Sequence, residues 1–371
     1  MNILIAGDFC PQARVKKLCE EGKYAEVLGD VREIIEKADF SIVNLECPIT
    51  RGGEQPIEKK GPNLQCSEKG VEAIKWTGFD SCTLANNHFL DFGEKGVSNT
   101  LVSCKSHGLV TVGGGMTIEE ASQTLYQEIE GKTLAVINCC EHEFSIASEV
   151  SAGSNPLNPI QQYYAIRDAK ENADYILVII HGGHEHYQLP SPRMQETYRF
   201  FIDAGADAVV NHHQHCFSGY EVYKGKPIFY GLGNFCFDNP KKRNNIWNEG
   251  YLVELTFSVS KTGFVIHPYR QCDENAKIMM LPLNEYDVRI TELNSIITDN
   301  TRLIKFTEQY YNSCMRSVSL LFEPVRNKYI LAAQKRGWLP SFLSKKQKIK
   351  LQNNILCESH KDKLFFYFEK E

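Results

Sequence analysis

The sequence predicts an α/β fold that is followed by a helical appendage. Short apolar runs that fit buried strands recur up to about residue 285, and helical segments alternate with several of them. Polar loops follow these runs, and open α/β sheets place their chemistry at the carboxyl ends of strands. After about residue 290 the pattern changes to helical apolar spacing, broken at Pro324 and Pro340. We therefore expect a first domain over residues 1–288 and a helical extension over residues 289–371.

The first elements are indicated by two apolar runs. Residues 2–7 (NILIAG) and 40–45 (FSIVNL) each fit a buried strand. Helical material is expected between them, over residues 14–37. Residues 51–63 (RGGEQPIEKKGPN) are rich in glycine, proline and charge, which predicts a loop.

The middle of the chain continues the alternation of helices and strands. Helices are expected over 67–77, 94–107 and 192–204, and residues 118–128 are expected to be helical or irregular. Further strands are predicted at 79–85, 109–112, 133–139, 175–180, 207–211, 250–258 and 263–268. Residues 219–223 and 227–230 flank Lys224-Gly225-Lys226, which is typical of a hairpin.

Composition limits the classes of protein that fit. The 371 residues are 42% hydrophobic and 23% charged, which is enough to form a sizeable core. The net charge of −5 argues against a nucleic-acid partner, because such proteins usually carry a basic domain. The 13 cysteines are scattered, so we expect buried, reduced thiols in a cytoplasmic protein. No apolar run is long enough for a transmembrane helix.

Histidines gather after two of the predicted strands. The run HGGHEH begins at His181, directly after YILVII, so His181 is the expected metal ligand of this cluster. His184 and His186 read more simply as surface residues. His213 and His215 follow DAVVN in an H-x-H pattern that places two imidazoles on one side of the chain.

Other polar residues also stand at strand ends. Asp8 suits a hard cation, although a turn aspartate would look the same. Glu46 alone is a weak signal. Asn87 offers an amide oxygen, and His88 is either a ligand or a proton donor; the alternative is an Asn-rich turn with Asp91 as a helix cap. Asn234 could orient the imidazoles or belong to a structural turn.

Several of these stretches occur together in one known family. They are GDFCP (7–11), NLECPIT (44–50), LANNHFLDFGEKG (84–96), HGGHEH (181–186), DAGADAVVNHHQH (203–215) and YKGKPIFYGLGNFCFD (223–238). In this order they resemble the poly-γ-glutamate capsule biosynthesis (CapA-like) family, whose domain is similar to a calcineurin-type metallophosphoesterase. The resemblance covers about residues 1–270. It implies a four-layer αββα sandwich with a two-metal site at one edge.

The resemblance also implies roles for individual residues. The first carboxylate would be Asp8, and the bridging carboxylate would be Glu46. Asn87 would be the amide ligand and His88 the proton donor or phosphate contact. The remaining imidazole ligands would be His181, His213 and His215. Glu185 would be an acidic residue of the cleft, which we assign with His88 to the catalytic group.

The chain departs from the usual pattern of the fold in the NLE stretch (44–46), which replaces the usual Gly-Asp-x-x-Asp, and at two single positions. Cys10 stands where a metallophosphoesterase has a histidine, and Asn211 stands where the family usually has a glycine. The number of ions, one or two, therefore stays open. The mixed ligand set suits Mn, Fe, Zn or Co.

We expect a metal-dependent, phosphoesterase-like hydrolase that acts on an anionic small molecule or polymer in capsule or cell-envelope synthesis. The alternative is a non-hydrolytic accessory protein, or an amide-bond-forming component, that binds an anionic substrate. In that case the helices after residue 289 would contact a membrane surface or a biosynthetic complex, and the lysines of 345–350 are the candidates for such a contact. A solvated helix face is the simpler explanation of those lysines.

Overall fold

The protein is described by a computed structural model that covers residues 1–259, 261–357, 359–360, 363–364 and 368. Two compact units make up the chain, Met1–Leu303 and Ile304–Glu371. The first unit contains two large β-sheets, and the second is helical.

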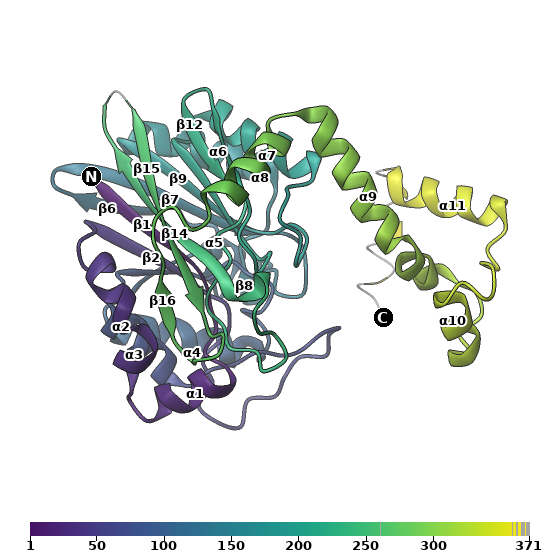
Figure 1. Cartoon of the computed structure of the whole chain (residues 1–371), viewed down its shortest axis with the longest axis horizontal. Helices are drawn as coiled ribbons and strands as arrows, with labels where there is room; N and C mark the ends of the chain where they lie inside the picture. The colour runs from purple at the N-terminus through teal and green to yellow at the C-terminus, as the bar shows by residue number, and fades with distance from the viewer. Residues whose placement is uncertain (260, 358, 361–362, 365–367, 369–371) are drawn as a thin grey trace. The chain divides into compact units, whose positions relative to one another are not determined.

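The first sheet has the strand order β16-β15-β14-β1-β2-β3-β4, and β13 pairs with β1 outside this path (Figure 1). Its strands are β1 (Asn2–Phe9), β2 (Phe40–Leu45), β3 (Ser81–Thr83), β4 (Val110–Val112), β13 (Asn234–Cys236), β14 (Glu249–Phe257), β15 (Thr262–Gln271) and β16 (Ile278–Met280). Strands β1 to β4 are parallel, so their carboxyl ends lie at one edge of the sheet.

The second sheet has the order β11-β12-β10-β9-β7-β6. Its strands are β6 (Leu125–Ile129), β7 (Lys132–Cys140), β9 (Tyr175–His181), β10 (Ala208–His212), β11 (Tyr220–Tyr223) and β12 (Lys226–Phe229). The central strands β7, β9, β10 and β12 are parallel. The predicted hairpin around Gly225 is confirmed, because β11 and β12 pair antiparallel. A small separate sheet joins β5 (Gly114–Gly115) to β8 (Gly153–Ser154).

Helices cover the outer face of each sheet. Those on the first sheet are α1 (Ala13–Glu20), α2 (Tyr24–Ile35), α3 (Glu68–Thr77) and α4 (Gly93–Ser106), which lie together at the lower left of Figure 1. Those on the second sheet are α6 (Pro159–Asn172) and α7 (Pro192–Ala204). The short elements are α5 (Ile118–Ala121) and the 3-10 turn Ile246–Asn248.

Alternating side chains of the strands build three apolar cores. In β1, Leu4 joins the core under α1 to α4, whereas Ile5 joins the core between the two sheets. In β9, Val178 faces the core under α6 and α7, and Ile179 faces the central core. Successive strand residues point to opposite faces, so both sheets are covered on both sides. The predicted α/β class and four-layer αββα sandwich are thereby confirmed.

The helical extension begins within the first unit. Helix α8 (Asp287–Ile297) buries Ile290, Ile296 and Ile297 in cores of that unit. The predicted boundary between residues 288 and 289 falls inside this helix, and as a domain boundary it stays a prediction. Helix α9 (Asn300–Ser319) then leads to the 3-10 turn Leu320–Phe322, α10 (Lys328–Lys335) and α11 (Lys345–Leu356). Among the described residues, no helix is both long and apolar enough to span a bilayer.

Three local predictions can be compared with the structure: the helix over 14–37, the conformation of residues 118–128 and the state of the cysteines. The single helix expected over 14–37 is divided into α1 and α2 at Gly22, whose φ of 70° is left-handed. Residues 118–128 were expected to be helical or irregular, but they contain α5 and most of β6, an edge strand paired with β7. The cysteines of the first unit are buried and outside any disulfide, as the scattered spacing predicted.

Gly7 allows β13 to approach β1 closely at the point where β1 ends. A Cβ atom at Gly7 would lie 1.9 Å from the Gly233 carbonyl oxygen. We expect Gly7→Ala to lower the free energy of unfolding by at least the roughly 1–3 kcal/mol typical of overpacking. Gly29→Ala is the matched control, since its Cβ would meet no atom within 4 Å and helix propensity favours alanine. Equal stabilities of the two variants in urea denaturation would contradict this account.

Candidate metal centre

The carboxyl ends of the parallel strands of both sheets meet at one site. Asp8 lies near the end of β1, and Glu46 follows β2. His181 ends β9, and the backbone N–H of His213, just after β10, donates to Asp8 Oδ2 at 3.2 Å. This last contact joins the first sheet to the second. The expected convergence of strand-end residues is therefore observed.

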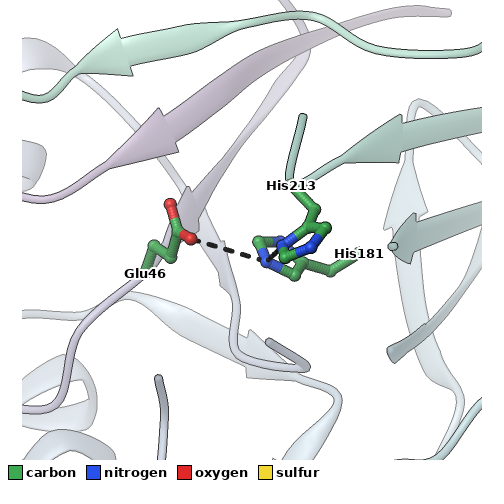
Figure 2. Close-up of side chains that lie close together, drawn as sticks. All are labelled: Glu46, His181 and His213. Carbon is green, nitrogen blue, oxygen red and sulfur yellow. Dashed lines mark hydrogen bonds and ion pairs between the residues drawn. The ribbon is translucent and has the colours of Figure 1, made fainter. Parts of the chain in front are cut away.

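Glu46, His181 and His213 form one group of the kind that can hold a metal ion, with one ligand atom from each residue within 4.8 Å of the others. Figure 2 shows the Glu46 carboxylate directed toward the two imidazoles. Glu46 Oε1 lies 3.5 Å from His181 Nε2, and His213 Nδ1 lies 3.1 Å from the same nitrogen. No hydrogen bond of ordinary geometry joins the Glu46 carboxylate to the His181 ring.

Asp8, Glu46 and His215 form a second group of the same kind. Asp8 Oδ2 lies 3.7 Å from His215 Nδ1, and Glu46 Oε1 lies 3.8 Å from His215 Nε2. Glu46 is the one residue that belongs to both of these groups. From the sequence it was the weakest of the candidates, yet it lies at the centre of the site.

Two buried carboxylates lie at the site, and one of them lacks the partners that anionic oxygens need. Glu46 is fully buried, and neither of its oxygens has a hydrogen-bond partner. Burial raises the pKa of Glu46 well above its usual value, and the charge of Asp8 adds to the effect. Burial also raises the pKa of Asp8 to about 7, although the Asn44 amide and the His213 N–H partly oppose this. A buried anion without partners is strongly disfavoured, so this pair suits a bound cation.

The imidazoles are in the state that metal ligation requires. Burial lowers the pKa of His181 and His215 well below the usual value and also lowers the pKa of His213, so all three rings are neutral at pH 7. A neutral ring keeps a lone pair for a cation. The residues present therefore fit a divalent metal.

His213 and His215 have an uncommon backbone conformation. Their φ values are 92° and 56°, in the left-handed region that side chains rarely adopt. Such strain persists only where surrounding contacts enforce it, and it gathers at functional sites. Here the bond from His213 N to Asp8 and the contact of His215 Nδ1 with Asn234 Oδ1, 2.9 Å long, hold the two residues.

Amide side chains orient the ligand candidates. Asn234 Oδ1 meets His215 Nδ1, which leaves His215 Nε2 to face Glu46. This is the orienting role considered for Asn234 from the sequence. Asn87 Oδ1 lies 3.1 Å from His181 Nε2, so the structure places this predicted amide ligand at the first group. Such outer contacts fix the tautomer and the orientation of metal-binding histidines.

Asn44 is a residue of the site that the sequence reasoning did not select. Its Nδ2 donates to Asp8 Oδ1 at 2.7 Å and lies 3.3 Å from His181 Nδ1. Residues two apart in a strand share a face, so the position of Asn44 two residues before Glu46 was the available signal.

The two residues assigned to catalysis lie in different surroundings. His88 is buried, and its Nδ1 lies 2.6 Å from Asp91 Oδ2. Asp91 therefore does not cap a helix, and α4 has no side-chain cap. Glu185 is exposed and belongs to neither metal-ligand group among the described residues. His184 lies outside these groups as well.

The raised pKa of Asp8 makes the stability of the metal-free protein depend on pH. The folded state binds this proton more tightly than the unfolded chain does, so the carboxyl destabilises the fold increasingly as pH rises from about 4 to 7. We expect Asp8→Asn to remove this dependence. Relative to wild type, the variant should gain up to about 4 kcal/mol across that window and no more above it.

The measurement is urea unfolding of chelator-treated protein at several pH values. Asp30→Asn is the control, because Asp30 is exposed. A stability difference between Asp8→Asn and wild type that stays constant from pH 5 to pH 8 would contradict the assigned burial of Asp8.

Solved structures with a similar arrangement include phosphatases. A phosphatase from Mycoplasma pneumoniae aligns with a TM-score of 0.45 and 16% identity, covering 74% of this chain and 95% of that chain. The 5'-nucleotidase precursor of Thermus thermophilus aligns with a TM-score of 0.44 and 12% identity, covering 85% and 60%. Similarity at this level carries no argument about the reaction.

Two relatives are closer in sequence. The capsule biosynthesis protein CapA of Bacillus anthracis is 32% identical over 246 residues, which cover 64% of this chain and 60% of that protein. The PGA biosynthesis protein CapA of Bacillus subtilis (strain 168) is 32% identical over 266 residues, covering 71% and 69%. The chain thus spans less than two thirds of the length of the first relative.

The family model of the bacterial capsule synthesis protein PGA_cap matches residues 2–239. This range contains every candidate site residue, from Asp8 to Asn234, and most of the strands that carry them. The resemblance inferred from the sequence motifs is confirmed. The chain belongs to the bacterial capsule synthesis protein (PGA_cap) family.

Proposed function

We propose that this protein is a metal-dependent hydrolase of the phosphoesterase type that acts in the synthesis of capsule or another cell-envelope polymer. The names of the two Bacillus relatives support the polymer context. The observation that carries the proposed chemistry is the Glu46 carboxylate. It is shared by two groups of ligand type, and neither oxygen has a hydrogen-bond partner.

In this proposal Glu46, His181 and His213 hold one divalent ion, and Asp8 and His215 hold a second together with Glu46. Asn87 adds an amide oxygen to the first set. Mn, Fe, Zn and Co all suit this ligand mixture, and the proposal covers one bound ion or two. When bound, such ions polarise the substrate and make water acidic enough to ionise near neutral pH.

His88 is the proposed proton donor. Asp91 accepts from its Nδ1, so Nε2 is the nitrogen left for the substrate. When protonated, Nε2 gives its proton to the leaving oxygen. Glu185 is exposed, and its proposed role is to contact the substrate at the rim of the metal centre.

The proposed substrate is anionic: a phosphoester, or a polyglutamyl or carbohydrate intermediate of envelope polymer assembly. Bound divalent ions would offset its negative charge in a site that otherwise contains buried carboxylates. A cytoplasmic location is part of this proposal.

Removal of a proposed imidazole ligand should remove both metal and turnover. We expect His213→Ala and His215→Ala each to lose bound metal and to lower hydrolysis of p-nitrophenyl phosphate by more than the roughly 10–100-fold typical of outer-shell partners. Elemental analysis gives the metal content, and a Mn-supplemented assay gives the rate. His142→Ala is the control, because His142 is exposed in the loop after β7. Full metal content in both ligand variants would refute the assignment.

The alternative function is that of a non-hydrolytic accessory protein, or an amide-bond-forming component, docked on an anionic membrane. Segregation of charge between the two units supports it. Residues 304–371 contain thirteen Lys and Arg against six Asp and Glu, a net charge of +7 within a chain of net −5. Within the described part of this unit, Trp338 is 73% exposed and Ile349 is 57% exposed. Basic helices with exposed apolar side chains are typical of peripheral membrane binding.

If this unit docks on a membrane, its lysines should carry the attraction. We expect the protein to sediment with vesicles that contain phosphatidylglycerol, and not with pure phosphatidylcholine vesicles. Replacing Lys345, Lys346, Lys348 and Lys350 with Gln should abolish sedimentation, because each lysine contributes about 1 kcal/mol near such a surface. The control replaces Lys16, Lys17, Lys95 and Lys105, which are exposed on the first unit. Equal binding of both quadruple variants would exclude this surface.

A further inference from the structure

The side chain of Lys59 is buried, although the residue lies in a segment without regular structure. Residues 51–63 connect β2 to α3 and were expected to form a charged loop, and they contain no helix or strand. Yet only 2% of the Lys59 side chain is exposed. Lysine is almost never buried unless it is paired. The burial therefore needs a specific partner.

The partner is Asp91, beside the proposed proton donor. Lys59 Nζ forms an ion pair with Asp91 Oδ1 and lies 3.1 Å from His88 Nδ1. The ring of Phe144, whose centroid is 5.5 Å from Nζ, lies on another side of the ammonium. The cation thus contacts both members of the His88–Asp91 pair.

Asp91 connects the loop to the site through several contacts. Its Oδ2 lies 2.6 Å from His88 Nδ1 and accepts from Leu64 N at 2.6 Å. Its backbone carbonyl accepts from Ile57 N at 3.0 Å. With Lys59 on Oδ1, both oxygens of this buried carboxylate are held by the segment that carries Lys59. The loop and the His88 ring are therefore fixed by the same group.

The distances decide how the three residues interact. A carboxylate oxygen 2.6 Å from Nδ1 requires that this nitrogen carry the hydrogen and donate it. Nδ1 then has no lone pair for Lys59, so the ammonium acts on His88 through Asp91. Without Lys59, the carboxylate would lose the ion pair on Oδ1 and would keep only the contacts of Oδ2 with His88 Nδ1 and Leu64 N, so the orientation of Oδ2 toward the ring would be less tightly fixed.

We propose that Lys59 is a positioning residue for His88, which it serves by holding the Asp91 carboxylate that in turn holds the His88 ring through Nδ1. This proposal rests on the proposed function, in which His88 delivers a proton. It also assigns Lys59 to the site, although the loop 51–63 around it is largely exposed. The competing explanation is that Lys59 only stabilises the conformation of the loop 51–63 and has no effect on His88.

The kinetic experiment compares variants of the full chain loaded with Mn, with p-nitrophenyl phosphate as substrate. We expect Lys59→Met to lower kcat by roughly 10–100-fold, as outer-shell partners typically do, with KM little changed. Lys59→Arg should recover part of the loss, because arginine keeps the charge. Lys60→Met is the matched control, since the neighbouring Lys60 is exposed and should leave kcat unchanged.

A double variant separates positioning from a merely structural role. If Lys59 acts through His88, Lys59→Met should have no further effect on kcat in a His88→Ala background. Effects that multiply in the double variant would overturn the proposal, as would an unchanged kcat in Lys59→Met. Thermal unfolding of each variant establishes that the compared proteins are folded at the assay temperature.

A second measurement does not depend on turnover. A hydrogen shared between His88 Nδ1 and Asp91 should give a downfield proton resonance in the NMR spectrum of the Zn-loaded protein, identified by its absence in His88→Ala. We expect it to persist in Lys60→Met and to shift or broaden in Lys59→Met. An identical resonance in Lys59→Met and wild type overturns the positioning role. If wild type hydrolyses no ester, the proposed function fails, whereas this resonance still decides the role of Lys59.

Discussion

The arrangement of the site depends on one electrostatic constraint, the burial of the Glu46 carboxylate without a hydrogen-bond partner on either oxygen. A protein interior tolerates such a group only if it is protonated or faces a cation. The surrounding side chains are consistent with the second solution, because imidazoles and another carboxylate lie around it. Without a proton or a cation, this buried carboxylate would destabilise the packing of the two sheets, whose shared core is apolar.

Both sheets are needed to create this environment. Asp8 and Glu46 come from the first sheet, and His181 and His213 come from the second. The parallel direction of the central strands brings these residues to one edge, and the apolar side chains between the sheets fix their separation. Glycine at position 7 lets β13 lie against β1, which places Asn234 beside Asp8 and within reach of His215. Fold and site are therefore specified by the same packing.

The sequence predicted the parts that local patterns encode. Apolar runs identified most strands, and polar residues directly after those runs identified the ligand candidates His181, His213 and Asp8. The sequence could not show that Glu46 is a stronger ligand candidate than the others, because an exposed glutamate at a strand end has the same local sequence as a buried one. The edge strand β6 was missed, since only its pairing with β7 distinguishes it from irregular chain. The pairing of Lys59 was likewise invisible, because its partner Asp91 is 32 residues away and was considered only as a possible helix cap.

The distribution of the ligand candidates along the chain has a consequence for when a metal ion could be bound during folding. The contact between Asp8 and the His213 backbone joins residues 205 positions apart. No short segment contains both carboxylates and the H-x-H pair, so an ion cannot nucleate folding in the way it does in a zinc finger. During translation the complete site cannot exist until residue 215 has left the ribosome and the two sheets have docked. Binding of an ion by the complete set of candidates would thus be a late event in the folding of this chain, and an early partial site would consist of carboxylates without their imidazoles.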